Sequence, residues 1–347
     1  MEEKIVVRFA TPADEDRIVE IGREQWTIIN SNYKACIGDE LFAAYYGTVE
    51  SRVAAKEEAI RANARDLEHC VVTEVDGVVA GFAHFTMKES YGKLCGTLGH
   101  NAVDNRYKGR GIAGRQYAFI YDAMRKAGCV AVNVHTGLDE KHAPARRAYE
   151  KSGFSLNLPD INYYRTLSWG DELHNPKPCA DEVVVRDACA ADEARILEIA
   201  AQQWTIINNI YKNRIGDELY AIYYGVVENR VENVVATLKD FLAKSPRSFV
   251  VTEVNGVVAG FATYRTVTLV NGAMGGVLGR NGVDNNFKGR GIAGRQYAAL
   301  YKKMLEDGCT YAQVHTGLDD AHAPARRAYE KSGFEKNLPD INYYMML

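Results

Sequence analysis

Length, composition and charge narrow the possibilities for this chain before any motif is considered. Its 347 residues exceed what one compact core usually holds, so two domains are expected. A hydrophobic fraction of 47% with 25% charged residues is typical of a globular protein, and a net charge of -3 argues against a nucleic-acid partner.

The first half of the chain alternates strand and helix patterns. Residues 4–10 predict a strand, and Thr11 to Asp16 then offers an N-cap, a proline and early acids that start a helix ending near Asn30. Asp76-Gly77 is typical of a hairpin turn. The other predicted elements are a helix over 39–65, strands over 69–75, 77–87 and 94–103, a helix over 111–128, a strand over 129–136, a helix over 143–153 and a strand over 161–167. The order β-α-α-β-β-β-α-β-α-β predicts an α/β fold, an α+β arrangement with a mixed sheet and helices on its faces.

The second half of the chain repeats the first at a period of about 180 residues, which is the length of a whole domain. The segment LGHNAVDNRYKGRGIAGRQYA from Leu98 returns as LGRNGVDNNFKGRGIAGRQYA from Leu278, and LPDINYY closes both copies. Between the copies, residues 168–181 contain two prolines and little periodic apolar pattern, which predicts a linker. We therefore expect one domain over 1–167 and a second over 182–347.

Each copy carries a glycine-rich turn between a strand and a helix. In the first copy the turn is Lys108-Gly109-Arg110-Gly111, and its twin occupies 288–291. Glycine permits positive φ and close approach of the backbone, and the N-terminus of the next helix presents free N–H groups, so the turn indicates a phosphate site. The turn lacks the GK-Ser/Thr ending of a P-loop and follows the fourth strand, so neither a nucleoside triphosphatase nor a dinucleotide fold is indicated.

The order of these motifs resembles the GCN5-related N-acetyltransferase (GNAT) family. The family's cofactor loop is Arg or Gln, two residues, Gly, one residue, then Gly or Ala, and this pattern falls on Arg106, Gly109 and Gly111. The second copy has Asn286 at the first position, which departs from the pattern. The helix that ends in AYEKSGF matches as well, and the resemblance covers nearly all of each copy. It implies two tandem domains that use acetyl-CoA as acyl donor.

The resemblance also implies where the donor binds. In this family the fourth and fifth strands diverge and the pantetheine arm lies between them like an extra strand. His142 and His322 stand where family members often carry an asparagine. The implied cofactor-binding residues are Val103, Arg106, Lys108, Gly109, Arg110, Gly111, Ile112, Ala113 and His142 in the first copy, and Val283, Asn286, Lys288, Gly289, Arg290, Gly291, Ile292, Ala293 and His322 in the second.

Acetyl transfer to an amine needs a base, an oxyanion donor and an acid for the leaving thiolate. The resemblance assigns the acid to Tyr149 and Tyr329, and the oxyanion donor to a backbone N–H near Val103 or Val283. No base is assigned, and water remains an alternative. The candidates are Glu24, His100, Asp104, Asp139 and Asp160, whose counterparts are Gln202, Arg280, Asp284, Asp319 and Asp340.

The family's acceptor pocket lies between the first two helices and the final strands. The resemblance implies that aromatic and amide side chains line this pocket. They are Trp26, Asn30, Tyr33, Tyr45 and Tyr163, with the counterparts Trp204, Asn208, Tyr211, Tyr223 and Tyr343. The acids Asp39, Glu40, Asp217 and Glu218 would attract a cationic amine. The acceptor is expected to be the amine of a small molecule or peptide, and the sequence does not distinguish a polyamine, an amino acid, an aminoglycoside or a peptide terminus.

Three arrangements remain open: two active domains, one active domain with a packed partner, or a non-catalytic acyl-CoA-binding or dimerisation module in which duplication replaces a homodimer. We expect a monomer with pseudo-dimeric domains or a homodimer. The seven cysteines show no zinc spacing, so they are expected to be reduced thiols and no metal is expected. The N-terminus has no signal-peptide pattern and no long apolar run occurs, which favours a cytoplasmic protein without a membrane partner.

Overall fold

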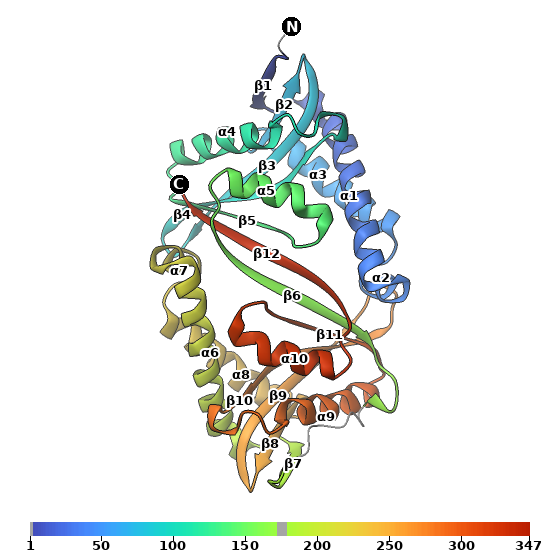
Figure 1. The fold of residues 1–347 in the computed structure, drawn as a ribbon, viewed down its shortest axis with the longest axis vertical. Coiled ribbons are helices and arrows are strands. Elements are labelled where there is room, and N and C mark those ends of the chain that lie inside the picture. The colour runs from blue at the N-terminus through green and yellow to red at the C-terminus, as the bar shows by residue number, and fades with distance from the viewer. Residues whose placement is uncertain (1–2, 172–178) are drawn as a thin grey trace.

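Both repeats contribute to one continuous sheet. The structure is a computed structural model that describes residues 3–171 and 179–347. Within these residues, twelve strands follow the order β1-β2-β3-β4-β5-β12-β6-β11-β10-β9-β8-β7 (Figure 1). The first repeat supplies β1 (Ile5–Phe9), α1 (Glu15–Ile37), α2 (Asp39–Tyr46), α3 (Val49–Arg65), β2 (Cys70–Val75), β3 (Val78–Ser90), β4 (Lys93–Val103), α4 (Ile112–Lys126), β5 (Ala131–Gly137), α5 (Ala143–Lys151) and β6 (Leu156–Thr166). The second supplies β7 (Val183–Asp187), α6 (Glu193–Ile215), α7 (Asp217–Tyr224), α8 (Val227–Lys244), β8 (Phe249–Val254), β9 (Val257–Thr268), β10 (Met274–Val283), α9 (Ile292–Glu306), β11 (Cys309–Gly317), α10 (Ala323–Lys331) and β12 (Lys336–Met346).

The predicted mixed α/β fold is confirmed, with one correction to the helices. The helix expected over 39–65 is two helices, because Gly47 adopts a φ of 82° and Thr48 caps α3 by accepting a hydrogen bond from the backbone N–H of Ser51 at 3.1 Å. The hairpin turn is where the sequence placed it, with positive φ of 51° at Asp76 and 79° at Gly77. Helix α1 is longer than predicted and continues to Ile37.

The last strand of each repeat lies in the half of the sheet built by the other repeat. Strand β6 lies between β12 and β11, and β12 lies between β5 and β6, so the two strands run side by side through the centre of the molecule (Figure 1). Their register is symmetric, with Asp160 opposite Asp340. This strand exchange joins the repeats. The proposed division into 1–167, 168–181 and 182–347 stays a prediction, and linker residues 172–178 lie outside the described residues.

Helices cover both faces of the sheet. On one face, Tyr117 of α4 packs with Val134 of β5 and with Tyr343, which comes from β12 of the other repeat. On the opposite face, Ile18 of α1 packs on Phe82 of β3. The second repeat builds the equivalent cores with α9 and α10 on the first face and α6 and α8 on the other. Each half of the molecule therefore has a core made by both repeats.

Strands β4 and β5 diverge partway along their length. Their pairing ends at Leu98, opposite Val134, although both strands continue beyond this point. In the second repeat the pairing of β10 with β11 ends at Val277, opposite Gln313. The expected divergence is thus confirmed, and on this side the backbone of 99–103 has no strand partner among the described residues.

Candidate functional site

The glycine loop between β4 and α4 is open to a ligand. Gly109 and Gly111 have φ of 83° and 74°, and the two glycines of the twin loop have 84° and 73°. A Cβ built at Gly109, Gly111 or Gly114 would meet no described atom within 4 Å. The first amides of α4 point out of the helix without a helical carbonyl to bond. The loop therefore fits an anionic oxygen group such as a phosphate.

Cationic side chains surround this loop. The Lys108 ammonium donates to Gln25 Oε1 at 3.1 Å, and the Arg110 guanidinium pairs with Glu3 and lies 5.0 Å from the centre of the Tyr107 ring. In the second repeat, Arg290 lies 2.5 Å from a carboxylate oxygen of Asp181. These contacts hold the cationic groups at the rim of both loops, where Arg110 and Arg290 are paired with carboxylates.

Asp104, one of the candidate bases, holds the start of the loop. Its side chain is 4% exposed and pairs with Arg17 and, at 2.6 Å, with Arg106. It also accepts a hydrogen bond from the backbone N–H of Arg106 at 2.9 Å. The bond from the Arg106 side chain, with the other donors, holds the pKa of Asp104 far below its usual range. Because such a carboxylate accepts protons poorly, Asp104 is a structural residue, and Asp284 with Arg195 repeats the arrangement at 2.5 Å.

Tyr149 lies under the gap between β4 and β5. Its hydroxyl accepts a hydrogen bond from Asn101 Nδ2 at 3.0 Å, Asn101 Oδ1 accepts from Tyr117 at 2.9 Å, and the two tyrosine rings stack. Burial raises the pKa of Tyr149, which keeps its hydroxyl protonated. Tyr329 and Asn281 make the same 3.0 Å bond. Asn101 and Asn281 are not among the individual site residues predicted from the sequence, although HNAV and RNGV retain them in the two repeats.

His142 lies beside Tyr33 of α1. Its ring stacks on Tyr33 at 5.9 Å and its Nδ1 lies 2.6 Å from Asp139. Asp139 also caps the following turn by accepting from the backbone N–H of Lys141 at 2.9 Å. Although burial opposes the effect, the His142 bond lowers the pKa of Asp139. Asp139, another candidate base, is therefore already engaged as a cap, and Asp319 holds His322 in the same way at 2.6 Å.

The acceptor residues expected on α1 lie together, but the tyrosine from the final strand does not join them. Asn30 is buried and donates to the Trp26 carbonyl at 2.8 Å, and Asn208 does the same to Trp204. Tyr163 faces the opposite side of the sheet, where it donates to Glu330 at 2.8 Å.

Tyr343 likewise donates to Glu150, at 2.7 Å, on that opposite side. Tyr163 and Tyr343 therefore do not join Trp26, Asn30 and their counterparts, because successive strand residues face opposite sides of a sheet, and a role for them in acceptor binding stays a prediction.

The neighbouring residues, Tyr164 and Tyr344, face the helices α2 and α7 instead, and we call this tyrosine-lined surface the predicted acceptor wall. Tyr164 meets Tyr46 of α2 with their hydroxyls 2.5 Å apart, and Tyr344 meets Tyr224 at 2.6 Å. Tyr45 packs edge-on against Tyr164 at 4.9 Å, and Tyr223 packs in the same way against Tyr344. Because adjacent strand residues face opposite sides, the sequence NYY shows that its two tyrosines face different sides of the sheet. It does not show which of the two faces the acceptor wall.

Two candidate bases, Asp160 and Asp340, meet at the pseudo-twofold axis. His135 Nε2 lies 3.1 Å from Asp340 and His315 Nε2 lies 2.9 Å from Asp160; we call these four residues the axial cluster. Burial, together with the Asp160 carboxylate, raises the pKa of Asp340 to about 6. Against the effect of burial, hydrogen bonds from His315 and Asp340 lower the pKa of Asp160. The two carboxylates and two histidines therefore influence one another's protonation where the repeats meet.

The remaining base candidates differ between the repeats. His100 faces α1 and α3, with Nε2 3.0 Å from the Lys56 ammonium and Nδ1 2.9 Å from Asn63 Nδ2. Burial, and then Lys56, lower the pKa of His100 to about 4, so its imidazole is neutral at pH 7. Arg280 occupies the same position in the second repeat. Glu24 accepts a hydrogen bond from Asn105 near the loop.

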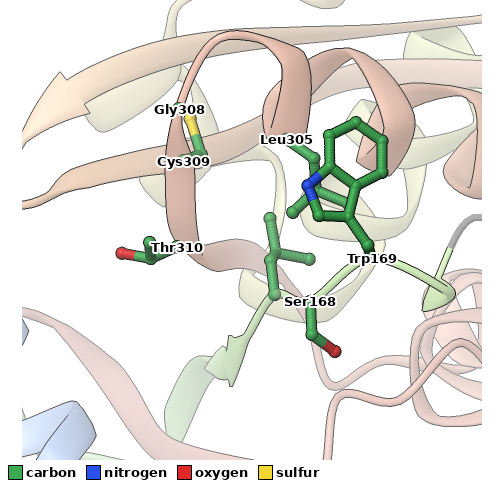
Figure 2. A pocket seen from close by; sticks show the side chains of 7 residues that line it. Ser168, Trp169, Leu305, Gly308, Cys309 and Thr310 are labelled. Carbon is green, nitrogen blue, oxygen red and sulfur yellow. The ribbon is translucent and has the colours of Figure 1, made fainter.

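Two surface hollows lie away from the glycine loops. One has a volume of about 370 Å³ and lies between the end of β6 and the C-terminal end of α9. Trp169, Leu305 and Cys309 line it (Figure 2), so it is at the opposite end of α9 from the glycine loop of the second repeat. The other, of about 520 Å³, lies between the two repeats and contains Asp39 and Glu40. These two acids therefore face the second repeat's α10–β12 turn.

The described residues give two further findings. They contain no cluster of three or more His, Cys, Asp or Glu side chains arranged to hold a metal ion. None of their helices is both long and apolar enough to span a membrane.

A divergent strand pair that ends at a glycine loop on a helix N-terminus defines an acyl-CoA-binding transferase fold. The sequence model of the Acetyltransferase (GNAT) family matches residues 37–154 and 214–334. The chain therefore belongs to the GNAT family, with two tandem domains, and acetyl-CoA is its acyl donor. Acyl transfer is the class of chemistry that the family carries out.

Solved structures are similar to the chain over nearly its whole length. A GCN5-related N-acetyltransferase from Sphaerobacter thermophilus is 16% identical, with 99% of this chain and 95% of that one covered and a TM-score of 0.51. A tandem GNAT protein from the clavulanic acid biosynthesis pathway is 14% identical, with 99% and 98% covered and a TM-score of 0.43. No curated protein matches the sequence. At this identity the Sphaerobacter structure supports the fold alone.

Proposed function

We propose that the chain is an N-acetyltransferase that transfers the acetyl group of acetyl-CoA to a primary amine of a small molecule or peptide, at one site in each repeat. The observation that supports this most directly is the gap between β4 and β5. It opens beside the glycine loop and is backed by Tyr149, and the second repeat has the same gap with Tyr329.

The residues on both sides of the gap suit direct attack of an amine on a thioester. The backbone N–H groups of the glycine loop would hold the pyrophosphate, and the free edge of 99–103 would bond the pantetheine amides. An N–H near Val103 would stabilise the developing negative charge on the carbonyl oxygen. The new C–N bond forms as the C–S bond breaks.

Proton transfer completes the reaction. The Tyr149 hydroxyl donates its proton to the departing thiolate, and Asn101 positions that hydroxyl. The proton of the amine leaves on the face of α1 and α3, through water or a side chain of that face. Asp104 and Asp139 are both held in structural bonds, so we do not assign the base to them.

Calorimetric titration of the whole chain with acetyl-CoA tests the proposal. Two sites per chain, with thiol released when amines are supplied, is the expected result. One site would mean that a single repeat is catalytic. Binding without thiol release across a broad amine panel would point to an acyl-CoA-binding module, and no binding would refute the cofactor assignment to the loops.

A further inference from the structure

Two cationic side chains of α3 lie on the acceptor face of the first repeat without a carboxylate partner among the described residues. Arg52 and Lys56 are four residues apart and so share one helix face. The Arg52 guanidinium lies 5.1 Å from the centre of the Tyr46 ring, and its Nε donates to Asn30 at 3.4 Å. The Lys56 ammonium contacts His100 and lies 5.9 Å from the Trp26 ring. Burial, and then Arg52, lower the pKa of Lys56.

The second repeat keeps a pair of cations but builds it from different positions. Arg230 replaces Arg52 and lies 5.5 Å from the centre of the Tyr224 ring, whereas Val234 replaces Lys56. The lost charge returns on β10, where Arg280 replaces the neutral His100. Burial, and then Arg230, lower the pKa of Arg280.

Neither arginine of the second repeat has an acidic partner within the described chain. Arg280 has no side-chain hydrogen bond or ion pair to described residues, and Arg230 Nε is fully buried with no partner there. Two partly desolvated like charges repel each other and have lost water without gaining a counter-ion, which is a cost that folded proteins usually avoid. A ligand that carries negative charge removes this cost. Each repeat has two cations at this place, although the second cation comes from a different sequence position in each. This retention of two charges indicates that both sites bind an anionic ligand.

The position of the cations identifies the ligand as the acceptor. His100 and Arg280 lie near the start of the free strand edge of the gap, and Arg52 and Arg230 lie over Tyr46 and Tyr224, which contact the predicted acceptor wall. The donor's pyrophosphate has its own site at the glycine loop, beyond the other end of that edge.

We propose that each acceptor site binds an anionic oxyacid group of the amine substrate, held by Arg52 and Lys56 in the first repeat and by Arg230 and Arg280 in the second. This inference rests on the proposed function. The substrate class is then an amine that also bears a carboxylate or a phosphate, such as an amino acid or a phosphorylated amine, and not a polyamine.

The test uses the whole chain and measures its unfolding temperature and calorimetric binding. Sodium acetate and inorganic phosphate are titrated separately in saturating coenzyme A, which blocks the glycine loops, so the two probes distinguish a carboxylate from a phosphate site. We expect saturable stabilisation by at least one anion. Lys56→Gln with Arg280→Gln should weaken it about tenfold or more, because charged hydrogen bonds are lost.

The same double variant should unfold at the same temperature as the parent chain or higher when no anion is present, because a like-charge contact is removed from each site. Lys88→Gln with Arg265→Gln is the matched control, since it removes one lysine and one arginine from exposed positions of β3 and β9. The control should bind the anions as the parent does. Absence of saturable binding of both anions, or unchanged binding by the Lys56/Arg280 variant, overturns the proposal.

Acetyl-CoA titration of the same proteins separates this inference from the function on which it rests. If acetyl-CoA fails to bind but an anion still binds through these cations, the proposed function fails and the anion site stands. If acetyl-CoA binds normally and neither anion does, the anion site fails alone.

Discussion

Expressing residues 1–167 alone removes β12 from the sheet of the first repeat and leaves β6 without neighbours. In the whole chain β6 buries Leu158, Ile161, Tyr163 and Tyr164 to between 2% and 6% exposure, and both of its strand partners, β11 and β12, come from the second repeat. At about 1.5–3 kcal/mol for each large apolar side chain, these contacts contribute roughly 6–12 kcal/mol. That is comparable to the whole stability of a domain, about 5–15 kcal/mol. We therefore expect no stable open monomer.

A second copy of the same fragment can restore the missing contacts. Residues 158–164 and 338–344 have the identical sequence LPDINYY, so β6 of one copy can take the place of β12 in the other. The expected product is a strand-exchanged homodimer with twofold symmetry. A net association free energy of about 8 kcal/mol would give a Kd of about 1 μM.

Sedimentation velocity across concentrations on both sides of about 1 μM measures this equilibrium, with circular dichroism to follow folding. Dimer formation and helical signal should rise together with concentration. Ile161→Asp in the fragment should abolish both, because it places a charge in the apolar core that β6 joins. A fully folded monomer at concentrations far below 1 μM would refute the reasoning, since it would mean that β6 can return to its own repeat.

Three further predictions concern the site and the centre of the sheet. Gly109→Val with Gly289→Val should abolish acetyl-CoA binding while the far-UV circular dichroism is unchanged, because the side chain fills the loop at positive φ; Gly128→Val, also at positive φ but at the far end of α4, should bind normally. Tyr149→Phe with Tyr329→Phe should lower kcat about 100-fold and leave calorimetric acetyl-CoA affinity unchanged, whereas full activity would remove both tyrosines from the mechanism. In the axial cluster, the hydrogen bonds to Asp340 and Asp160 raise the pKa of His135 and His315 above 6.5. The folded state therefore binds protons more tightly than the unfolded state, and this stabilisation is lost as the pH rises through the raised pKa values. The unfolding temperature should therefore fall from pH 6 to pH 8, and replacing both histidines with asparagine should flatten that fall; an unchanged slope would show that the cluster does not titrate there.

The sequence predicted most of the elements correctly because their local causes are strong. Each of these causes involves only a few neighbouring residues. Examples are the alternating apolar residues of the strands, the Asp76-Gly77 turn, and the proline and acids before α1. The break at Gly47 was missed because apolar residues continue at helical spacing across it, and only the observed positive φ shows that the chain turns.

The face of each tyrosine on β6 and β12 depended on tertiary structure. Strand alternation predicts that Tyr163 and Tyr164 face opposite sides, but which side holds the acceptor wall depends on the helices that cover the sheet. The two pairs of cations were missed for a related reason. Lys56 and Arg280 lie on different elements, so only their common position on the acceptor face shows that one replaces the other.

The sequence by itself determined the tandem repeat, the mixed α/β fold of each copy and the glycine loop, because these follow from local pattern and from self-similarity along the chain. Only the tertiary structure decided which half of the sheet each final strand joins. Since LPDINYY is identical in both repeats, either strand can make the same contacts in either half, and no local sequence signal distinguishes the two pairings. The exchange depends on how the chain connects the repeats and on the continuous sheet that they form together.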